Sequence, residues 1–325
     1  MTRIRRTVSL APAPAGISVV VPVYNSEATV HRLVSQIADA LPGAHEVILV
    51  DDGSSDGSWA AIEREAAERS NVTGIRLMRN FGQHPATLQG VLAAAMPVIV
   101  TIDDDLQHDP ADVPALVARL DEGYDVVYGL AADPQHSPGR RLASAGLKLA
   151  MRHAMGVKGV EETSPFRAFR TEVRQAFEHH SGPYVSIDVL LSWGTTRFTS
   201  LAVEHRSREV GRSNYTFTKL VQHATNMVTG FTAWPLRLAS GVGFATTLLG
   251  LAVLVYVLGR YALSGGQSVP GFPFLASAIA IFAGVQLFAL GIMGEYLARL
   301  HFRSMGRPHS VVRTVAGRGT GRTPD

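Results

Sequence analysis

At 325 residues the chain is long enough for about two domains, and 46% of it is hydrophobic while only 18% is charged, against roughly 25% charged residues in an ordinary soluble domain. The 30 basic and 27 acidic residues leave a formal net charge of +3, which is too small to bind nucleic acid by charge alone, so we expect no nucleic-acid partner. The sequence contains no cysteine, which excludes disulfides, thiolate metal sites and cysteine nucleophiles.

The first 16 residues carry three arginines and are interrupted by Pro12 and Pro14, a pattern that favours a flexible tail over a signal peptide. From residue 17 onward, short apolar runs rich in β-branched residues alternate with helical patterns. Strands are predicted over 17–23, 46–50, 74–78, 97–102 and 125–128, and helices over 27–41, 57–70, 84–95 and 111–122. The alternation predicts an α/β domain over 17–215 with a mostly parallel sheet, which binds its ligands at the carboxyl ends of the strands.

Four polar motifs follow these apolar runs: PVYNSE from Pro22, DDGSSD from Asp51, RNFGQH from Arg79 and DDDLQ from Asp103. The glycine patterns of dinucleotide dehydrogenases and of P-loop enzymes are both missing from the sequence. Three adjacent aspartates repel one another, and a hard cation such as Mg²⁺ or Mn²⁺, sharing its ligand sphere with a diphosphate, would neutralise them. The alternative is a solvated acidic turn in which Asp109 and Pro110 start the next helix.

In this order the motifs resemble those of the family-two glycosyltransferases, which have the GT-A fold. The later string SREVGRSNY over 207–215, followed by two apolar spans, is similar to the polyisoprenyl-phosphate glycosyltransferases, a group that includes dolichol-phosphate mannose synthase. The motif RNFGQH makes the bacterial undecaprenyl-phosphate aminoarabinose-type transferases the nearest likeness, over about residues 17–313. The resemblance implies inverting transfer of one sugar from a nucleotide-sugar to polyprenyl phosphate.

The resemblance also implies roles for single residues. Those expected to bind the nucleotide-sugar donor are Pro22, Tyr24, Asn25, Glu27, Asp51, Asp52, Asp103 and Asp104. Those expected to hold the metal, Mg²⁺ or Mn²⁺, are Asp105, Asp103 and Gln107. Those expected to hold the acceptor phosphate are Arg140, Ser144, Arg208, Arg212 and Ser213. The catalytic residues would be Asp103, Asp105 and Arg208. Asn214 replaces a lysine that is usual in the family, and Arg212 is expected to compensate for it.

A lipid phosphate is already anionic near neutral pH, so this transfer needs no strong general base. One alternative is a membrane glycosyltransferase with a hydroxyl acceptor on a glycolipid or a protein, which would need a base such as Glu161 or Glu162. Another is a non-catalytic membrane scaffold. Trp193 and Phe198 are interpreted as core residues rather than as a stacking platform for a sugar.

The remaining segments predict contact with a membrane. Basic residues recur along 139–155, which predicts an interfacial helix; the alternative is an ordinary surface helix. Apolar residues follow helical spacing over 216–235, which predicts a second interfacial helix; the alternative is packing on the globular domain. Two charge-free runs predict transmembrane helices over 238–259 and 273–294. Arginines flank their outer ends, which predicts a multi-pass protein of the cell (inner or plasma) membrane with its catalytic domain, both termini and the tail 295–325 in the cytoplasm. Gln286 is expected to bond the neighbouring helix or another subunit of a homo-oligomer.

Overall fold

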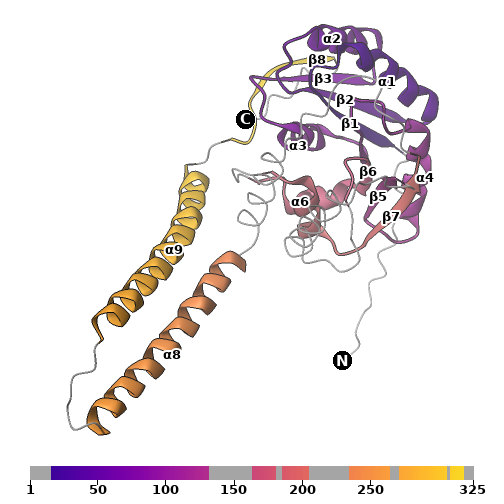
Figure 1. Cartoon of the computed structure of the whole chain (residues 1–325). Coiled ribbons are helices and arrows are strands. Elements are labelled where there is room, and N and C mark those ends of the chain that lie inside the picture. The colour runs from indigo at the N-terminus through magenta and orange to yellow at the C-terminus, as the bar shows by residue number, and fades with distance from the viewer. Residues whose placement is uncertain are drawn as a thin grey trace, which may run out of the picture. The chain divides into compact units, whose positions relative to one another are not determined.

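The structure is a computed structural model that describes residues 16–131, 163–180, 185–204, 234–263, 271–305 and 308–317. The chain divides into two compact units. The first comprises Met1–Tyr215 with Pro308–Asp325, and the second comprises Thr216–Arg307 (Figure 1). The predicted interfacial helix 139–155 lies outside the described residues. So do all but the last residue of the predicted N-terminal tail 1–16 and all but the last two residues of the predicted helix 216–235.

Within its described residues, the first unit is built on one eight-stranded sheet with the order β7-β5-β6-β4-β1-β2-β3-β8. The strands are β1 (Ile17–Val23), β2 (His45–Asp51), β3 (Val72–Leu77), β4 (Val98–Thr101), β5 (Val126–Ala131), β6 (Arg167–Arg170), β7 (Phe198–Val203) and β8 (Val312–Gly317). The helices are α1 (Glu27–Ala40), α2 (Ser58–Glu68), α3 (Gln83–Ala93), α4 (Val113–Asp121) and α6 (Ile187–Gly194), with short 3₁₀ helices η1 (Pro110–Asp112) and η2 (Thr171–Ala176).

The central strands of this sheet run parallel and are covered on both faces. β1 lies between β4 and β2 and pairs in parallel with both, and β2 pairs in parallel with β3. Helices α1, α2 and α4 pack on one face, and α3 and α6 pack on the other (Figure 1). In α1 the buried residues Val30, Leu33, Val34 and Ile37 follow the spacing of one helix face. The prediction of an α/β domain with a mostly parallel sheet is confirmed.

Three strands were not predicted. β6 runs antiparallel to both β4 and β5, and β7 runs parallel to β5 at one end of the sheet. At the other end, β8 runs antiparallel to β3. The region 295–325, expected as a simple tail, therefore supplies a strand of the catalytic sheet, and its first ten residues continue a helix that ends at Ser304.

The second unit contains two long helices, α8 (Trp234–Leu263) and α9 (Phe272–Ser304). They pack against each other at Gly250, where an added Cβ would lie 3.0 Å from Cζ of Phe282. Among the described residues, no helix is both long enough and apolar enough to span a membrane.

Candidate functional site

The polar motifs predicted to form a site meet at the carboxyl ends of β1, β2 and β4. The register of β1 and β2 places Val23 opposite Asp51, and the backbone N–H of Asp52 donates to the carbonyl of Val23 at 2.9 Å. On the other side of β1, the backbone N–H of Tyr24 donates to Oδ2 of Asp104 at 3.0 Å. These hydrogen bonds join the motif after β1 to the motifs after β2 and β4 at one edge of the sheet.

The turns after β1 and β2 are joined by their own polar side chains. Asn25 has a left-handed backbone with φ of 52°, and its Oδ1 accepts a hydrogen bond from the N–H of Ser55 at 2.8 Å. The carboxylate of Glu27 accepts the N–H of Gly57 at 3.1 Å, and a Cβ at Gly57 would lie only 2.4 Å from that carboxyl group. The predicted donor residues Asn25 and Glu27 thus also fix the shape of the edge itself.

Asp51 is fully buried and faces Arg76 of β3, which is its register partner. Its Oδ1 accepts the N–H of Ser54 at 3.0 Å, and its Oδ2 lies 3.3 Å from Nε of Arg76. This contact is an ion pair, and Oδ2 has no hydrogen-bond partner among the described residues. Asp51 is therefore paired in charge and still has one oxygen able to accept a further N–H.

Asp52 has no such oxygen left. Its Oδ1 accepts the N–H of Phe81 at 2.7 Å, and its Oδ2 accepts the N–H of Gly82 at 2.8 Å. Burial raises the pKa of this carboxyl group, although the two backbone hydrogen bonds partly oppose that shift. In this structure Asp52 holds the loop between β3 and α3, so its predicted contact with the nucleotide stays a prediction.

The three aspartates after β4 make different contacts. Removal from water, followed by the negative charges of Asp105 and Asp104, raises the pKa of Asp103 to about 7. Burial also raises the pKa of Asp104. Oδ1 of Asp105 accepts the N–H of Gln107 at 3.1 Å across Leu106, whose φ of 61° is unusual for a side chain of that size. The negative charge at this strand end is only partly compensated.

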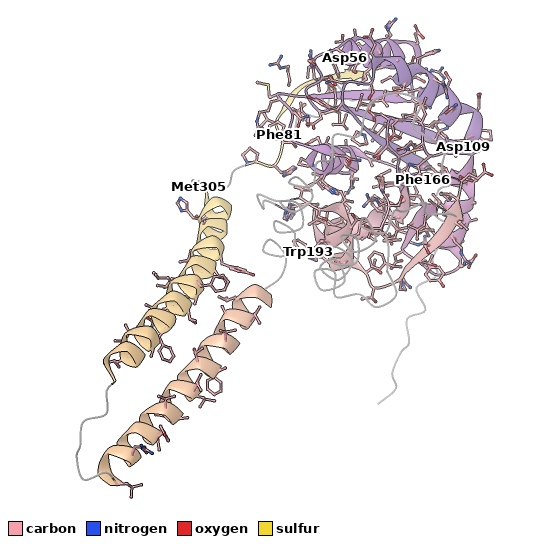
Figure 2. All side chains as sticks on the ribbon, in the orientation of Figure 1. Asp56, Phe81, Asp109, Phe166, Trp193 and Met305 are labelled. Atoms are coloured by element: carbon pink, nitrogen blue, oxygen red, sulfur yellow. The ribbon has the colours of Figure 1, made fainter. Side chains whose placement is uncertain are left out.

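Among the described residues, no three acidic or histidine side chains converge as a ready metal cage. A Mg²⁺ or Mn²⁺ ion that shares its ligands with a diphosphate needs only one or two carboxylates. Asp103 and Asp105 fit that requirement, because a divalent cation would stabilise the charged form of Asp103, which burial and the neighbouring carboxylates disfavour. Asp109 has a different role, since its side chain accepts the N–H of Ala111 at 3.0 Å and caps η1 (Figure 2). The alternative interpretation of this turn was therefore right about Asp109 and Pro110.

Two buried charged residues near the acidic cluster were missed by the sequence analysis. Arg167 on β6 and Asp188 on α6 are 3% and 6% exposed and form an ion pair, with Nη1 of Arg167 donating to Oδ1 of Asp188. The hydroxyl of Tyr128 donates to the same oxygen at 3.0 Å. The positive charge of Arg167 acts against the rise in the pKa of Asp103. Single charges inside the apolar runs SPFRAF and VSIDVLL were the signal that could have revealed both residues.

The prediction that Trp193 packs in a core is wrong. Its side chain is 51% exposed on α6 and meets the ring of His180 edge-on (Figure 2). Phe198 is partly buried and stacks on Tyr128 with 6.3 Å between ring centroids, as expected for a core residue. The predicted acceptor-phosphate residues all lie outside the described residues, as do Asn214 and the two candidate bases: Arg140, Ser144, Arg208, Arg212, Ser213, Asn214, Glu161 and Glu162.

Comparison with known proteins agrees with the motifs. Residues 18–177 match the model of the family described as glycosyl transferase family 2. Over 306 residues, which are 93% of this chain and 94% of the relative, the sequence is 34% identical to an undecaprenyl-phosphate 4-deoxy-4-formamido-L-arabinose transferase of Yersinia pestis (strain Pestoides F). The chain belongs to glycosyltransferase family 2. This glycosyltransferase is equally similar to the transferase of the same name from Yersinia pseudotuberculosis serotype O:3 (strain YPIII).

Two solved structures resemble the glycosyltransferase more distantly. Glucosyl-3-phosphoglycerate synthase from Mycobacterium tuberculosis is 22% identical, with a TM-score of 0.47, over 66% of this chain and 77% of that one. TarS from S. aureus is 17% identical, with a TM-score of 0.45, over 66% of this chain and 39% of that one.

Proposed function

We propose that this glycosyltransferase transfers a single sugar from a nucleotide-sugar to polyprenyl phosphate, specifically undecaprenyl phosphate, with inversion at the anomeric carbon. The observation that carries the proposal is the 34% identity to transferases named for undecaprenyl phosphate, which extends over 93% of the chain. The alignment therefore covers both the catalytic domain and most of the helical unit, where a lipid acceptor has to be met.

The donor would bind at the edge formed by β1, β2 and β4. Tyr24 is 48% exposed there, and Asp51, at the end of β2, would face the base. Asp103 and Asp105 would hold Mg²⁺ or Mn²⁺ against the diphosphate, with Gln107 in the same turn. When bound, the ion would stabilise the negative charge that develops on the departing nucleoside diphosphate.

The nucleophile would be the acceptor phosphate, whose second ionisation near pH 6 leaves it anionic in the cell. A protein base is then unnecessary. We further propose that Arg140, Ser144, Arg208, Arg212 and Ser213 hold the acceptor phosphate.

The helices α8 and α9 are proposed to anchor the enzyme in the cell membrane, with the catalytic domain and both termini on the cytoplasmic side. Support comes from the charge-free sequence and from large apolar side chains that remain exposed along both helices, among them Phe244, Leu249, Val255, Ile279, Leu287 and Phe288. Gln286 of α9 is exposed as well, which favours a hydrogen bond to another subunit over one to α8.

The proposal is tested by supplying the purified protein with undecaprenyl phosphate and labelled UDP-, GDP- and dTDP-sugars, with Mg²⁺ or Mn²⁺ and with a chelator. We expect label in the lipid phase from one donor class, lost on chelation and strongly reduced in Asp105→Asn. Asp109→Asn is the matched control, because Asp109 lies in the same turn and caps η1. Label transferred instead to diacylglycerol or to a protein, in the absence of the lipid phosphate, would overturn the proposal.

A further inference from the structure

The loop between β3 and α3 bridges two parts of the site that lie on opposite sides of β1. At one end, Asp52 binds the N–H groups of Phe81 and Gly82, as described above. At the other end, Gln83 is the first residue of α3, and its Nε2 donates to Oδ1 of Asp103 at 2.6 Å. Phe81 lies beside the start of α3 (Figure 2). The loop thus joins the carboxylate after β2 to the carboxylate after β4.

The backbone of this loop allows little freedom. Gly53, with φ of +69°, packs so closely that an added Cβ would lie 2.5 Å from the carbonyl carbon of Arg79. Gly82 has φ of +104°, a conformation that other residues rarely adopt. Once Asp52 has fixed the amides of Phe81 and Gly82, the first turn of α3 is fixed too, and the hydroxyl of Thr87 bonds the carbonyl of Gln83 at 2.8 Å.

We propose that Gln83 is a positioning residue for Asp103, and that Asp52 acts through the loop 81–83 to hold Gln83 in place. The hydrogen bond from Gln83 occupies Oδ1 of Asp103 and directs Oδ2 toward the metal and the donor diphosphate. This inference rests on the proposed function, because it takes Asp103 as a ligand of the divalent cation. It assigns Asp52 a structural task, whereas the family resemblance implies contact with the nucleotide.

The charge and chemistry of Gln83 suit this task. An amide can donate to a carboxylate without adding charge of either sign, so the ion still meets an anionic ligand. Such hydrogen-bonding partners of metal ligands typically change metal affinity by about 10–100-fold when they are removed. Gln83 is exposed apart from this contact, so its replacement should leave the fold intact.

The test is a titration of the full-length purified protein with Mn²⁺ alone, in which the paramagnetic resonance signal of the free ion reports binding. We expect Gln83→Leu to weaken Mn²⁺ binding by at least about tenfold while its thermal unfolding stays close to that of the wild type. Gln89→Leu is the matched control on the same helix, because Gln89 bonds Ser310 and lies outside the acidic cluster; its Mn²⁺ affinity should not change.

A second variant separates the two steps. Asp52→Asn should weaken Mn²⁺ binding in the same direction, and the double variant should be no weaker than Gln83→Leu alone, since both changes act through one hydrogen bond. Wild-type affinity in Gln83→Leu would overturn the inference and leave the proposed function intact. If the wild type itself binds no Mn²⁺ while sugar transfer resists chelation, the metal step of the proposed function fails, and the inference fails with it.

Discussion

Replacing Arg167 with methionine should destabilise the catalytic domain more than replacing both members of its ion pair. Arg167 and Asp188 are almost completely buried, and the hydroxyl of Tyr128 donates to the same oxygen of Asp188 that Arg167 contacts. In Arg167→Met the carboxylate of Asp188 stays buried, and among the described residues Tyr128 alone still donates to it. The double variant Arg167→Met/Asp188→Leu buries no charge and leaves only the Tyr128 hydroxyl without its acceptor.

The magnitudes follow from these contacts. Removing one partner of a buried ion pair costs about 3–5 kcal/mol, whereas replacing the whole pair by apolar side chains is often neutral. The Tyr128 hydroxyl left unsatisfied adds about 1–3 kcal/mol to the double variant. We therefore expect the single variant to lose about 4 kcal/mol in free energy of unfolding, and the double variant to lose about 2 kcal/mol.

Urea denaturation of the purified protein, followed by circular dichroism, measures both values. Tyr128→Phe is the control for the hydroxyl, and it should account for most of the loss in the double variant. A double variant as unstable as Arg167→Met would refute the reasoning, because the cost would then come from lost packing and not from an unpaired buried charge.

The other predictions concern the strand ends. Because burial raises the pKa of Asp103 from 3.8 to about 7, the folded protein binds more protons than the unfolded chain between those two pH values. The unfolding free energy of the metal-free protein, measured by urea denaturation, should therefore fall as the pH rises from about 4 to 7. In Asp103→Asn this fall should be shallower. Since the pKa of Asp103 is about 7, Mn²⁺ should displace a proton from this carboxyl group when it binds. Titration with Mn²⁺ should then show an affinity that rises about tenfold from pH 6 to 8. An affinity that stays constant would show that Asp103 is not a ligand. Gly53→Ala should lower the thermal unfolding temperature, because the added Cβ would lie too close to the backbone of Arg79. Gly43→Ala should not, because nothing lies within 4 Å of its added Cβ. Equal effects of the two changes would contradict this reasoning. Val312 lies on the half-buried strand β8, and Val312→Asp should destabilise the domain by about 1–3 kcal/mol in the same urea assay. Arg313→Asp, on the exposed side of β8, should have no such effect. Equal stability of the two variants would show that β8 does not pair with β3 in solution.

The sequence predicted the first five strands to within a few residues, because each is a short apolar run next to a helical pattern. It did not predict β6, whose four residues RAFR include two arginines, or β8, whose VRTVAG carries an exposed charge. Both strands pair antiparallel with partners distant in sequence, at Val100 opposite Ala168 and at Ile75 opposite Val315. Local patterns of hydrophobicity contain no information about such pairings.

At the site, the sequence predicted which motifs meet, because the carboxyl ends of parallel strands share one edge. It did not predict how each carboxylate is used. Asp51 and Asp52 are adjacent and chemically identical, yet one keeps an oxygen without a hydrogen bond and the other has both oxygens bound to backbone amides. That difference depends on where the loop after β3 runs, and this path is set by Gly53 and Gly82. A motif therefore identifies the edge of the sheet, while the tertiary structure assigns the task of each residue.

The electrostatics of this edge explain why cation and donor are expected to bind together. Burial, followed by the negative charges of Asp105 and Asp104, raises the pKa of Asp103 to about 7, and the positive charge of Arg167, which is itself paired with Asp188, acts against that rise. A nucleoside diphosphate approaching alone would add negative charge to this cluster, whereas a cation bound first would reduce that charge and leave coordination positions for the diphosphate oxygens. Binding of the cation therefore assists binding of the donor, and the hydrogen bonds of Asp52 and Gln83 keep the acidic strand end in shape for both.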